Sequence, residues 1–229
     1  MTDPASDANA HFKRGMEKAS GRQYQAAHRD FQRAVEVGPD HAEAWSELGW
    51  LTYGLDLGLG EASQCLEQAI RLDPMLGMAH LYYGVVSHRQ SENERAEAHF
   101  CMALGLVEQP GLAHAVYAEE FLWRNSRYGE AEEHFRAALD LDPDLVLALR
   151  DYARMLVCHG RDAESKEMFS RALRVDPWGT EPEQFLHAYA SSIPTQDPPP
   201  PVKAWKNCSG SVLLFRNLRS RPPIHGAWT

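Results

Sequence analysis

Residues 131–143 of the chain read AEEHFRAALDLDP, and the pattern within this stretch occurs five times. Each copy has a small residue, a large apolar residue four positions later and an alanine three positions after that. The copies begin at Ala27, Ala62, Ala96, Ala131 and Ser165. Their large apolar residues, which we call the anchor residues, are Phe31, Leu66, Phe100, Phe135 and Phe169. The anchor residues recur every 34 or 35 positions, and this period indicates a stack of similar units.

The pattern is that of one face of an α-helix, because positions i, i+4 and i+7 lie on the same side of a helix. In four copies a proline follows, and proline ends a helix because it has no N–H to donate. A second helical pattern precedes each copy and contains a small residue. These small residues are Gly15, Gly49, Gly84, Ala118 and Ala153. We therefore expect each unit to be a pair of helices.

The spacing between units is more constant than the spacing within them. From each anchor residue to the next small residue there are always 18 positions. From the small residue to the anchor of the same unit there are 16 positions, or 17 in the second and fourth units. Glycines 54, 58 and 60 indicate a loose turn that absorbs the extra residue of the second unit.

This arrangement resembles the tetratricopeptide repeat family over about three quarters of the chain. Trp45, Leu48 and Gly49 match the first helix of the family pattern, and Tyr128 and Ala131 match the second. The resemblance implies an all-α fold, a right-handed α-solenoid of about five helix-turn-helix units with a C-terminal capping helix. The departures from the pattern are Arg14 in a large apolar place, Glu108 in place of proline and Ser165 in place of alanine.

We expect the repeat array to span residues 8–190 and a proline-rich, basic and disordered tail to span residues 191–229. The expected units are about 8–41, 42–76, 77–111, 112–145 and 146–179, followed by the cap at 180–190. The tail carries a net charge of +4, so the rest of the chain carries −13 out of the total of −9. An acidic array repels phosphate groups, and we therefore expect no nucleic-acid partner.

The composition also favours a cytoplasmic protein. No stretch approaches the roughly 20 apolar residues that cross a bilayer, so no membrane partner is expected. Residues 1–10 lack the basic start and apolar core of a signal peptide. The four cysteines form no CxxC pair, which favours reduced thiols in a cytosolic setting.

The sequence shows no set of residues with the spacing of a catalytic site, no glycine-rich phosphate loop and no HExxH motif. Histidines are numerous, and His80 and His114 hold matching places on first helices, as His99 and His134 do on second helices. A zinc site needs three or four ligands with supporting partners, which this pattern does not supply. We therefore expect a non-enzymatic protein with no catalytic residue, no cofactor and no bound metal.

In proteins of the tetratricopeptide repeat family, which this chain resembles, the first helices line a concave groove that holds a partner peptide or helix. The register of the small residues predicts which side chains face this groove. The predicted groove residues are Trp50, Tyr53, Met78, Leu81, Tyr82, Val85, His88, Arg89, Val116, Glu119, Leu122, Trp123, Arg150 and Arg154. Exposed clusters of Trp, Tyr, Met and Arg are typical of interface hot spots. Each of these side chains is also a candidate for the core, since a narrow superhelix buries part of its inner face.

The leading hypothesis is an adaptor or scaffold that binds a protein or peptide partner in the groove through apolar and aromatic residues. The alternative is a cytosolic secretion-type chaperone that holds an apolar segment of a client. A third hypothesis is autoinhibition, in which the basic tail occupies the groove. The sequence makes no prediction of the oligomeric state.

One subclass of partner is disfavoured. Co-chaperones of this family that bind acidic C-termini use lysine and asparagine side chains on consecutive first helices. The matching places here hold Phe12, Met16, Glu47, Met78 and Tyr82. Without a cationic fork, a terminal carboxylate has no group to bind.

Overall fold

The structure, a computed structural model, describes residues 4–176, and within this range it contains helices and no strand. The all-α prediction is therefore confirmed for the described residues. The predicted cap at 180–190 and the predicted tail at 191–229 lie outside them.

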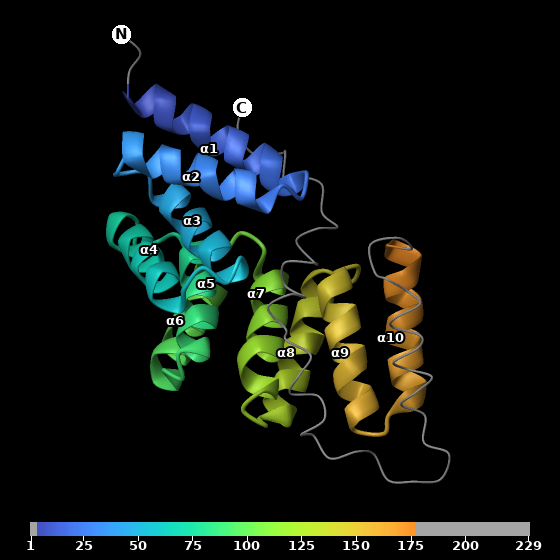
Figure 1. The fold of residues 1–229 in the computed structure, drawn as a ribbon. Coiled ribbons are helices and arrows are strands. Elements are labelled where there is room, and N and C mark those ends of the chain that lie inside the picture. Colours follow the sequence, from blue (N-terminus) through green and yellow to red (C-terminus); the bar gives the residue numbers. More distant parts are fainter. Residues whose placement is uncertain (1–3, 177–229) are drawn as a thin grey trace. The chain divides into compact units, whose positions relative to one another are not determined.

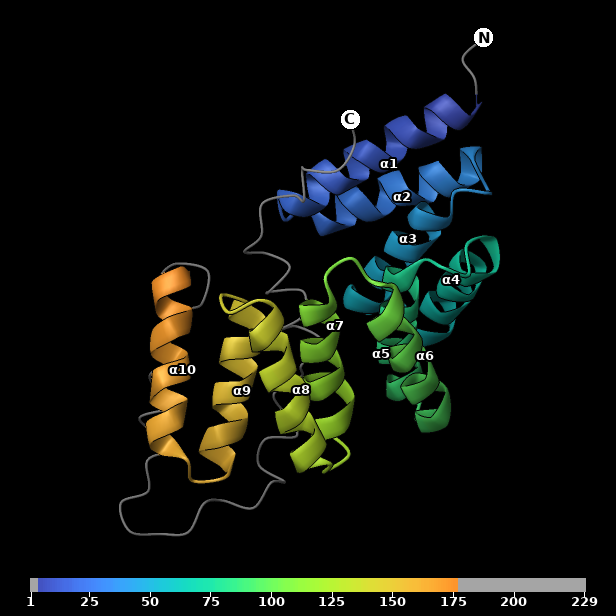
Figure 2. The same cartoon turned by 180° about the vertical axis from the view of Figure 1, so that it is seen from behind.

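The helices form two compact parts, which we call the N-terminal part (residues 4–108) and the C-terminal part (residues 109–176). The N-terminal part contains α1 (Pro4–Ser20), α2 (Tyr24–Val37), α3 (Ala42–Gly54), α4 (Leu59–Leu72), α5 (Gly77–Arg89) and α6 (Asn93–Leu106). The C-terminal part contains α7 (Pro110–Tyr117), η1 (Ala118–Trp123), α8 (Tyr128–Leu141), α9 (Val146–Cys158) and α10 (Asp162–Val175). Consecutive helices pack as pairs, as α1 and α2 show in both views (Figures 1 and 2).

Four of the five anchor residues fill the space inside their helix pairs, and the fifth, Phe169, is partly exposed. Phe31, Leu66, Phe100 and Phe135 are all 0% exposed. Burying a side chain of this size contributes roughly 1.5–3 kcal/mol. The small residues make room for them: a Cβ atom at Gly15 would lie 2.6 Å from the ring of Phe31. The periodic pattern thus encodes the contact between the two helices of a unit.

Two of the three departures from the repeat pattern are compensated by polar contacts. Arg14 donates a hydrogen bond of 3.0 Å from Nε to the buried carboxylate of Asp30 on α2. Ser165 is 0% exposed, and its hydroxyl donates to the carbonyl of Ala153 at 2.9 Å. Both side chains therefore sit at helix contacts without leaving their polar atoms unsatisfied.

The turn inside each pair contains one residue in the left-handed conformation. These residues are Arg22, Asp56, Ser91, Ser126 and Gly160, with φ angles between 57° and 69°. The left-handed conformation costs an L-residue roughly 1–2 kcal/mol, so glycine is the residue expected at such positions. Four of these five residues are not glycine, and the turns could therefore not be located from glycines in the sequence. In the second unit the extra residue follows Asp56, in the turn that contains Gly58.

The extra residue of the fourth unit lies inside its first helix. There α7 continues directly into η1, a π-helical segment. From small residue to left-handed residue there are seven positions in four units, but eight from Ala118 to Ser126. A π-helical turn accommodates one more residue because its hydrogen bonds join residues i and i+5. Because π-helical segments are frequent at functional sites, the helix that contains η1 is a candidate functional site.

Candidate functional site

Three aromatic rings form a stack in the N-terminal part, between the first helices α3 and α5. The rings of Trp50 and Tyr82 lie parallel, with centroids 4.4 Å apart and an interplanar angle of 8°. Tyr53 lies 5.4 Å from Trp50, and its hydroxyl accepts a hydrogen bond of 3.0 Å from Nε of Arg89. All three rings are buried, so the stack stabilises the contact between two repeats.

A carboxylate lies at the other end of this stack. The hydroxyl of Tyr82 donates to Oε1 of Glu47 at 3.4 Å. Removal from water raises the pKa of Glu47 to about 7, and the hydrogen bond from Tyr82 opposes this change. The same environment raises the pKa of Tyr82 well above its ordinary value. Glu47 thus holds the tyrosine ring in place and is easily protonated.

The C-terminal part contains a group of charged side chains on η1, on the turn that precedes α8 and on α9, which we call the charged network. Its members are Glu119, Glu120, Arg124, Arg150, Asp151 and Arg154. Oε1 of Glu119 lies 3.4 Å from Arg124 and 3.6 Å from Arg154. Glu120 follows Glu119 on η1, and its Oε2 lies 3.3 Å from Nε of Arg124. The π-helical segment therefore directs two consecutive carboxylates towards arginines.

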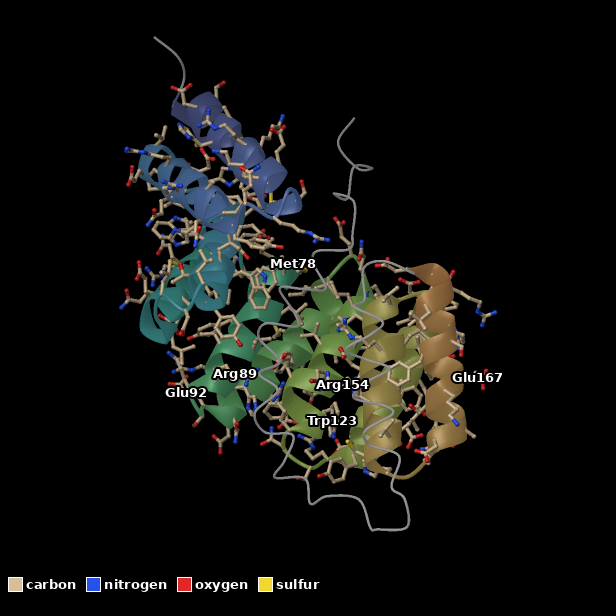
Figure 3. The ribbon with its side chains drawn as sticks, turned by 45° about the vertical axis from the view of Figure 1, so that its right-hand side comes forward. Met78, Arg89, Glu92, Trp123, Arg154 and Glu167 are labelled. Carbon is tan, nitrogen blue, oxygen red and sulfur yellow. The ribbon has the colours of Figure 1, made fainter. Side chains whose placement is uncertain are left out.

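Asp151 connects the arginines of α9. It accepts a hydrogen bond of 3.0 Å from Arg154 and lies 3.4 Å from Arg150. Arg154 also lies over the indole ring of Trp123, 5.2 Å from its centroid, and Figure 3 shows the two side chains close together. Trp123 and Arg154 are only partly buried, so this pair forms the accessible edge of the network.

Glu119 is one of three members of the network, with Glu120 and Arg124, that have a buried polar atom without a hydrogen-bond partner. It is 5% exposed, and its Oε2 has no hydrogen-bond partner. Burial raises the pKa of Glu119 to about 7, while the neighbouring Arg154 opposes the increase. A buried acceptor without a hydrogen-bond partner lowers the stability of the fold, because it has lost its hydrogen bonds to water without replacement.

The predicted groove residues form two sets, one buried and one partly exposed. Nine are buried, namely Trp50, Tyr53, Leu81, Tyr82, Val85, Val116, Glu119, Leu122 and Arg150. Five are partly exposed, namely Met78, His88, Arg89, Trp123 and Arg154. Met78 and Arg89 lie near the two ends of α5 (Figure 3). For all of these residues, contact with a partner remains a prediction.

Sequence reasoning did not single out three members of the charged network, which are Glu120, Arg124 and Asp151. The signal that could have located two of them is the spacing of the fourth unit, where 17 positions separate Ala118 from Phe135. The extra position introduces a π-helical turn, and this turn changes the direction in which the following side chains point.

Histidines pair within repeats rather than between matching helices. Nδ1 of His80 lies 2.9 Å from Nδ1 of His99, and His114 and His134 have the same separation. Since Nε2 of His80 donates to the carbonyl of Pro74 at 3.0 Å, its Nδ1 accepts from His99 when both rings are neutral. Burial and the neighbouring His80 lower the pKa of His99 to about 4.

Neither a metal site nor a membrane span is found among the described residues. Between residues 4 and 176, no three or more His, Cys, Asp or Glu side chains are grouped so that they could hold a metal ion. Among the helices of this range, none combines the length and the apolar character that a membrane span requires.

Known proteins resemble the chain in sequence and in fold. The human mitochondrial import receptor subunit TOM70 is 25% identical over 177 residues, which are 74% of this chain and 29% of the receptor. The crystal structure of TTC0263, a thermophilic TPR protein of Thermus thermophilus, has a TM-score of 0.69 and 19% identity, and the match covers 80% of this chain and 97% of that one. The type IV pilus biogenesis factor PilW has a TM-score of 0.68 and 18% identity, with 91% and 90% covered.

At these identities the likeness to the solved structures is one of fold, and the chain spans less than a third of the receptor's length. The match to a family model extends further. A model described as tetratricopeptide repeat matches residues 12–55, 58–112 and 122–182, which together are more than half of the chain. With the paired helices and buried anchor residues described above, this match makes the chain a member of the tetratricopeptide repeat family.

Proposed function

We propose that the protein is a non-enzymatic adaptor that binds a protein or peptide partner through its first helices. The family fold supports a role as a protein–protein interaction scaffold, and an import receptor subunit among the relatives fits such a role. A cytoplasmic setting is part of the proposal, because Cys65, Cys101 and Cys158 are free thiols.

The observation that carries the proposal is the pairing of Trp123 with Arg154. Both residue types are enriched in interface hot spots, and both side chains here are partly exposed. Asp151 and Glu119 fix the guanidinium of Arg154, so the pair loses little conformational entropy when a partner binds. In the N-terminal part, the accessible residues Met78, His88 and Arg89 offer a second contact region.

The test is affinity capture of partners by the purified chain, followed by mass spectrometry. Trp123→Ala should lose the captured partner, whereas Glu133→Ala, an exposed change on α8, should retain it. Circular dichroism must show that both variants keep their helices. Equal capture by both variants would contradict the proposed surface.

The captured protein also separates adaptor from chaperone. A folded and stable partner supports the adaptor, while one apolar secreted client supports the secretion-type chaperone. Tyr82 is unsuited to this test because it lies inside the aromatic stack, and its replacement by alanine would remove a core contact.

A further inference from the structure

A cavity of about 300 Å³ opens on the first unit between α1 and α2, which lie side by side in Figures 1 and 2. This volume is at the lower end of the range of ligand sites in proteins. Lys18 of α1 lines it, together with Ala26, Arg29, Asp30, Gln32, Arg33 and Glu36 of α2. Three of these side chains are cationic, so the charges of the lining indicate the class of ligand.

Two arginines of the lining are available to a ligand. Arg29 and Arg33 lie one helical turn apart, so their side chains share one face of α2. Within residues 4–176, Nε of Arg29 donates to the carbonyl of Gln25 at 3.3 Å, and Arg29 has no carboxylate partner. Arg33 pairs with Glu36 at 2.8 Å, but both side chains are more than half exposed, and such pairs are weak. An incoming anion can therefore take the place of Glu36.

The buried carboxylate in the lining does not repel an anion, because cations already surround it. Asp30 accepts hydrogen bonds from both Arg14 and Lys18. With Arg14 included, the side chains around the cavity are four basic and two acidic ones, a net charge of +2. The cavity therefore favours a negatively charged ligand.

The repeat fold does not require the two arginines. The places two positions before and two positions after the anchor residue hold Arg29 and Arg33 in the first unit, but Gln64 and Gln68 in the second. Two like charges one turn apart also weaken a helix. A pair that lowers helix stability and is not needed for packing points to a role in binding.

The first unit differs in charge from the rest of the N-terminal part. Residues 4–37 contain six basic and four acidic side chains, a net charge of +2. Residues 38–108 contain three basic and eleven acidic side chains, a net charge of −8. A long polyanion such as a nucleic acid would be repelled by these acidic units, so a short anionic ligand is favoured.

We infer that this cavity binds an extended acidic segment of a partner protein, in which two carboxylate side chains are separated by one residue. Side chains two positions apart in an extended chain point to the same side and lie about 6.6 Å apart. Residues one turn apart on a helix have Cβ atoms about 5–6 Å apart, so the two carboxylates match the spacing of Arg29 and Arg33. Each carboxylate then accepts two parallel hydrogen bonds from one guanidinium. The site is a second contact region, on helices other than those of Trp123 and Arg154, and it goes beyond the proposed function.

The test is the fluorescence anisotropy of a labelled peptide mixed with the full chain at low ionic strength, where exposed charges are least screened. The probe is a short serine peptide with two glutamates separated by one serine. One control peptide has glutamine in both places, and the other has the two glutamates adjacent. We expect the glutamine peptide to bind at least tenfold more weakly than the probe, and the adjacent-glutamate peptide to bind about threefold more weakly.

Variants of the chain locate the bound peptide. Arg29→Gln and Arg33→Gln should each weaken binding of the probe at least fivefold, and neither should unfold the chain, because the second unit has glutamine in both places. Glu36→Gln should strengthen binding about twofold, since it removes the competing carboxylate. Arg71→Gln, a matched change at an exposed place on α4 outside the cavity, should leave binding unchanged.

Equal binding of the glutamate and glutamine peptides, or an equal loss in Arg71→Gln and Arg29→Gln, would overturn the inference. Binding of a phosphoserine peptide without binding of the glutamate probe would also overturn it, in favour of a phosphate site. Trp123→Ala should bind the probe as the wild type does, which separates this site from the proposed partner surface. If the probe binds while Trp123→Ala captures its partner normally, the acidic-peptide site stands and the proposed partner surface fails. If the probe does not bind while capture depends on Trp123, the inference fails and the proposed function stands.

Discussion

At the scale of the residue, the missing side chain of one glycine sets how closely two helices pack. A Cβ atom at Gly49 would lie 2.8 Å from Cγ of Leu66 and 3.0 Å from the carbonyl oxygen of Ala62. The same relation holds between Gly84 and Phe100. These pairs could be predicted from the sequence, because a small residue and a large one recur at fixed spacing on helices that must touch.

Gly49→Ala should therefore destabilise the N-terminal part. The new methyl group has to displace Leu66 and the backbone of α4, and over-packing of this kind costs typically about 1–3 kcal/mol. Gly105→Ala on α6 is the control, since no atom beyond its chain neighbours and the backbone of its own helix lies within 4 Å of its Cβ position. It should stabilise the helix by roughly 0.5–1 kcal/mol. Urea unfolding followed by circular dichroism measures both, and equal midpoints would refute the packing argument.

Other features of single residues could not be predicted. The left-handed turn residues Arg22, Asp56 and Ser91 carry no glycine signal, since the repeat as a whole imposes their conformation. The register placed Trp50 and Tyr82 on an inner face, but it could not show that they stack and bury one another. Periodicity gives the direction of a side chain, and only the neighbouring helix determines its exposure.

The paired histidines give one residue-level prediction on pH. The pKa of His99 is about 4 in the folded chain, against an ordinary value of 6.5, so the unfolded chain binds this proton first as the pH falls. The stability that neutral His99 contributes is complete above about pH 6.5 and is lost as the pH falls towards about 4. Glu47, whose pKa is raised to about 7, acts in the opposite direction, so the comparison must be between variants.

The free energy of unfolding of the wild type and of His99→Gln should therefore differ most near pH 7, and the difference should shrink by pH 4. Urea titrations at half-unit intervals of pH measure it. A difference that stays constant across this range would show that the proton on His99 is not linked to folding.

At the scale of the element, the first helix of the fourth unit differs from the others by one residue. The spacing of 17 residues between Ala118 and Phe135 indicates one extra residue in this unit. The sequence alone does not show whether that residue lies in a loop or in a helix. In the second unit the turn after Asp56 does so, and in the fourth unit η1 does so. Only η1 changes the direction of charged side chains, and it thereby brings Glu119 and Glu120 to the arginines.

Deletion of Glu120 shortens the spacing from Ala118 to the anchor residue from 17 to 16 positions. We expect the shortened chain to fold with a regular α-helix here, because the spacing then equals that of the first, third and fifth units. Helix content by circular dichroism should be retained, and partner capture should fall because a regular helix no longer directs Glu119 towards Arg154. Deletion of a residue within α8, which has no π-helical turn, is the control and should disrupt folding. A chain without Glu120 that fails to fold would contradict this view of η1.

At the scale of the whole molecule, the repeat pattern predicted the helix pairs and the family, whereas the binding surface depends on features that vary between units. The N-terminal part has an aromatic stack ended by Glu47 and Arg89, and the C-terminal part has a charged network edged by Trp123. Both lie on first helices. An identical repeat would present an identical face in every unit, so the differences between these faces are what can distinguish one partner from another.

The most direct test of the central claim is the dissociation constant of the captured partner, measured by isothermal titration calorimetry. For Trp123→Ala we predict binding at least tenfold weaker than for the wild type, a loss of about 1.4 kcal/mol. Glu133→Ala should bind as the wild type does. An unchanged dissociation constant for a folded Trp123→Ala chain would show that the partner does not bind at this surface.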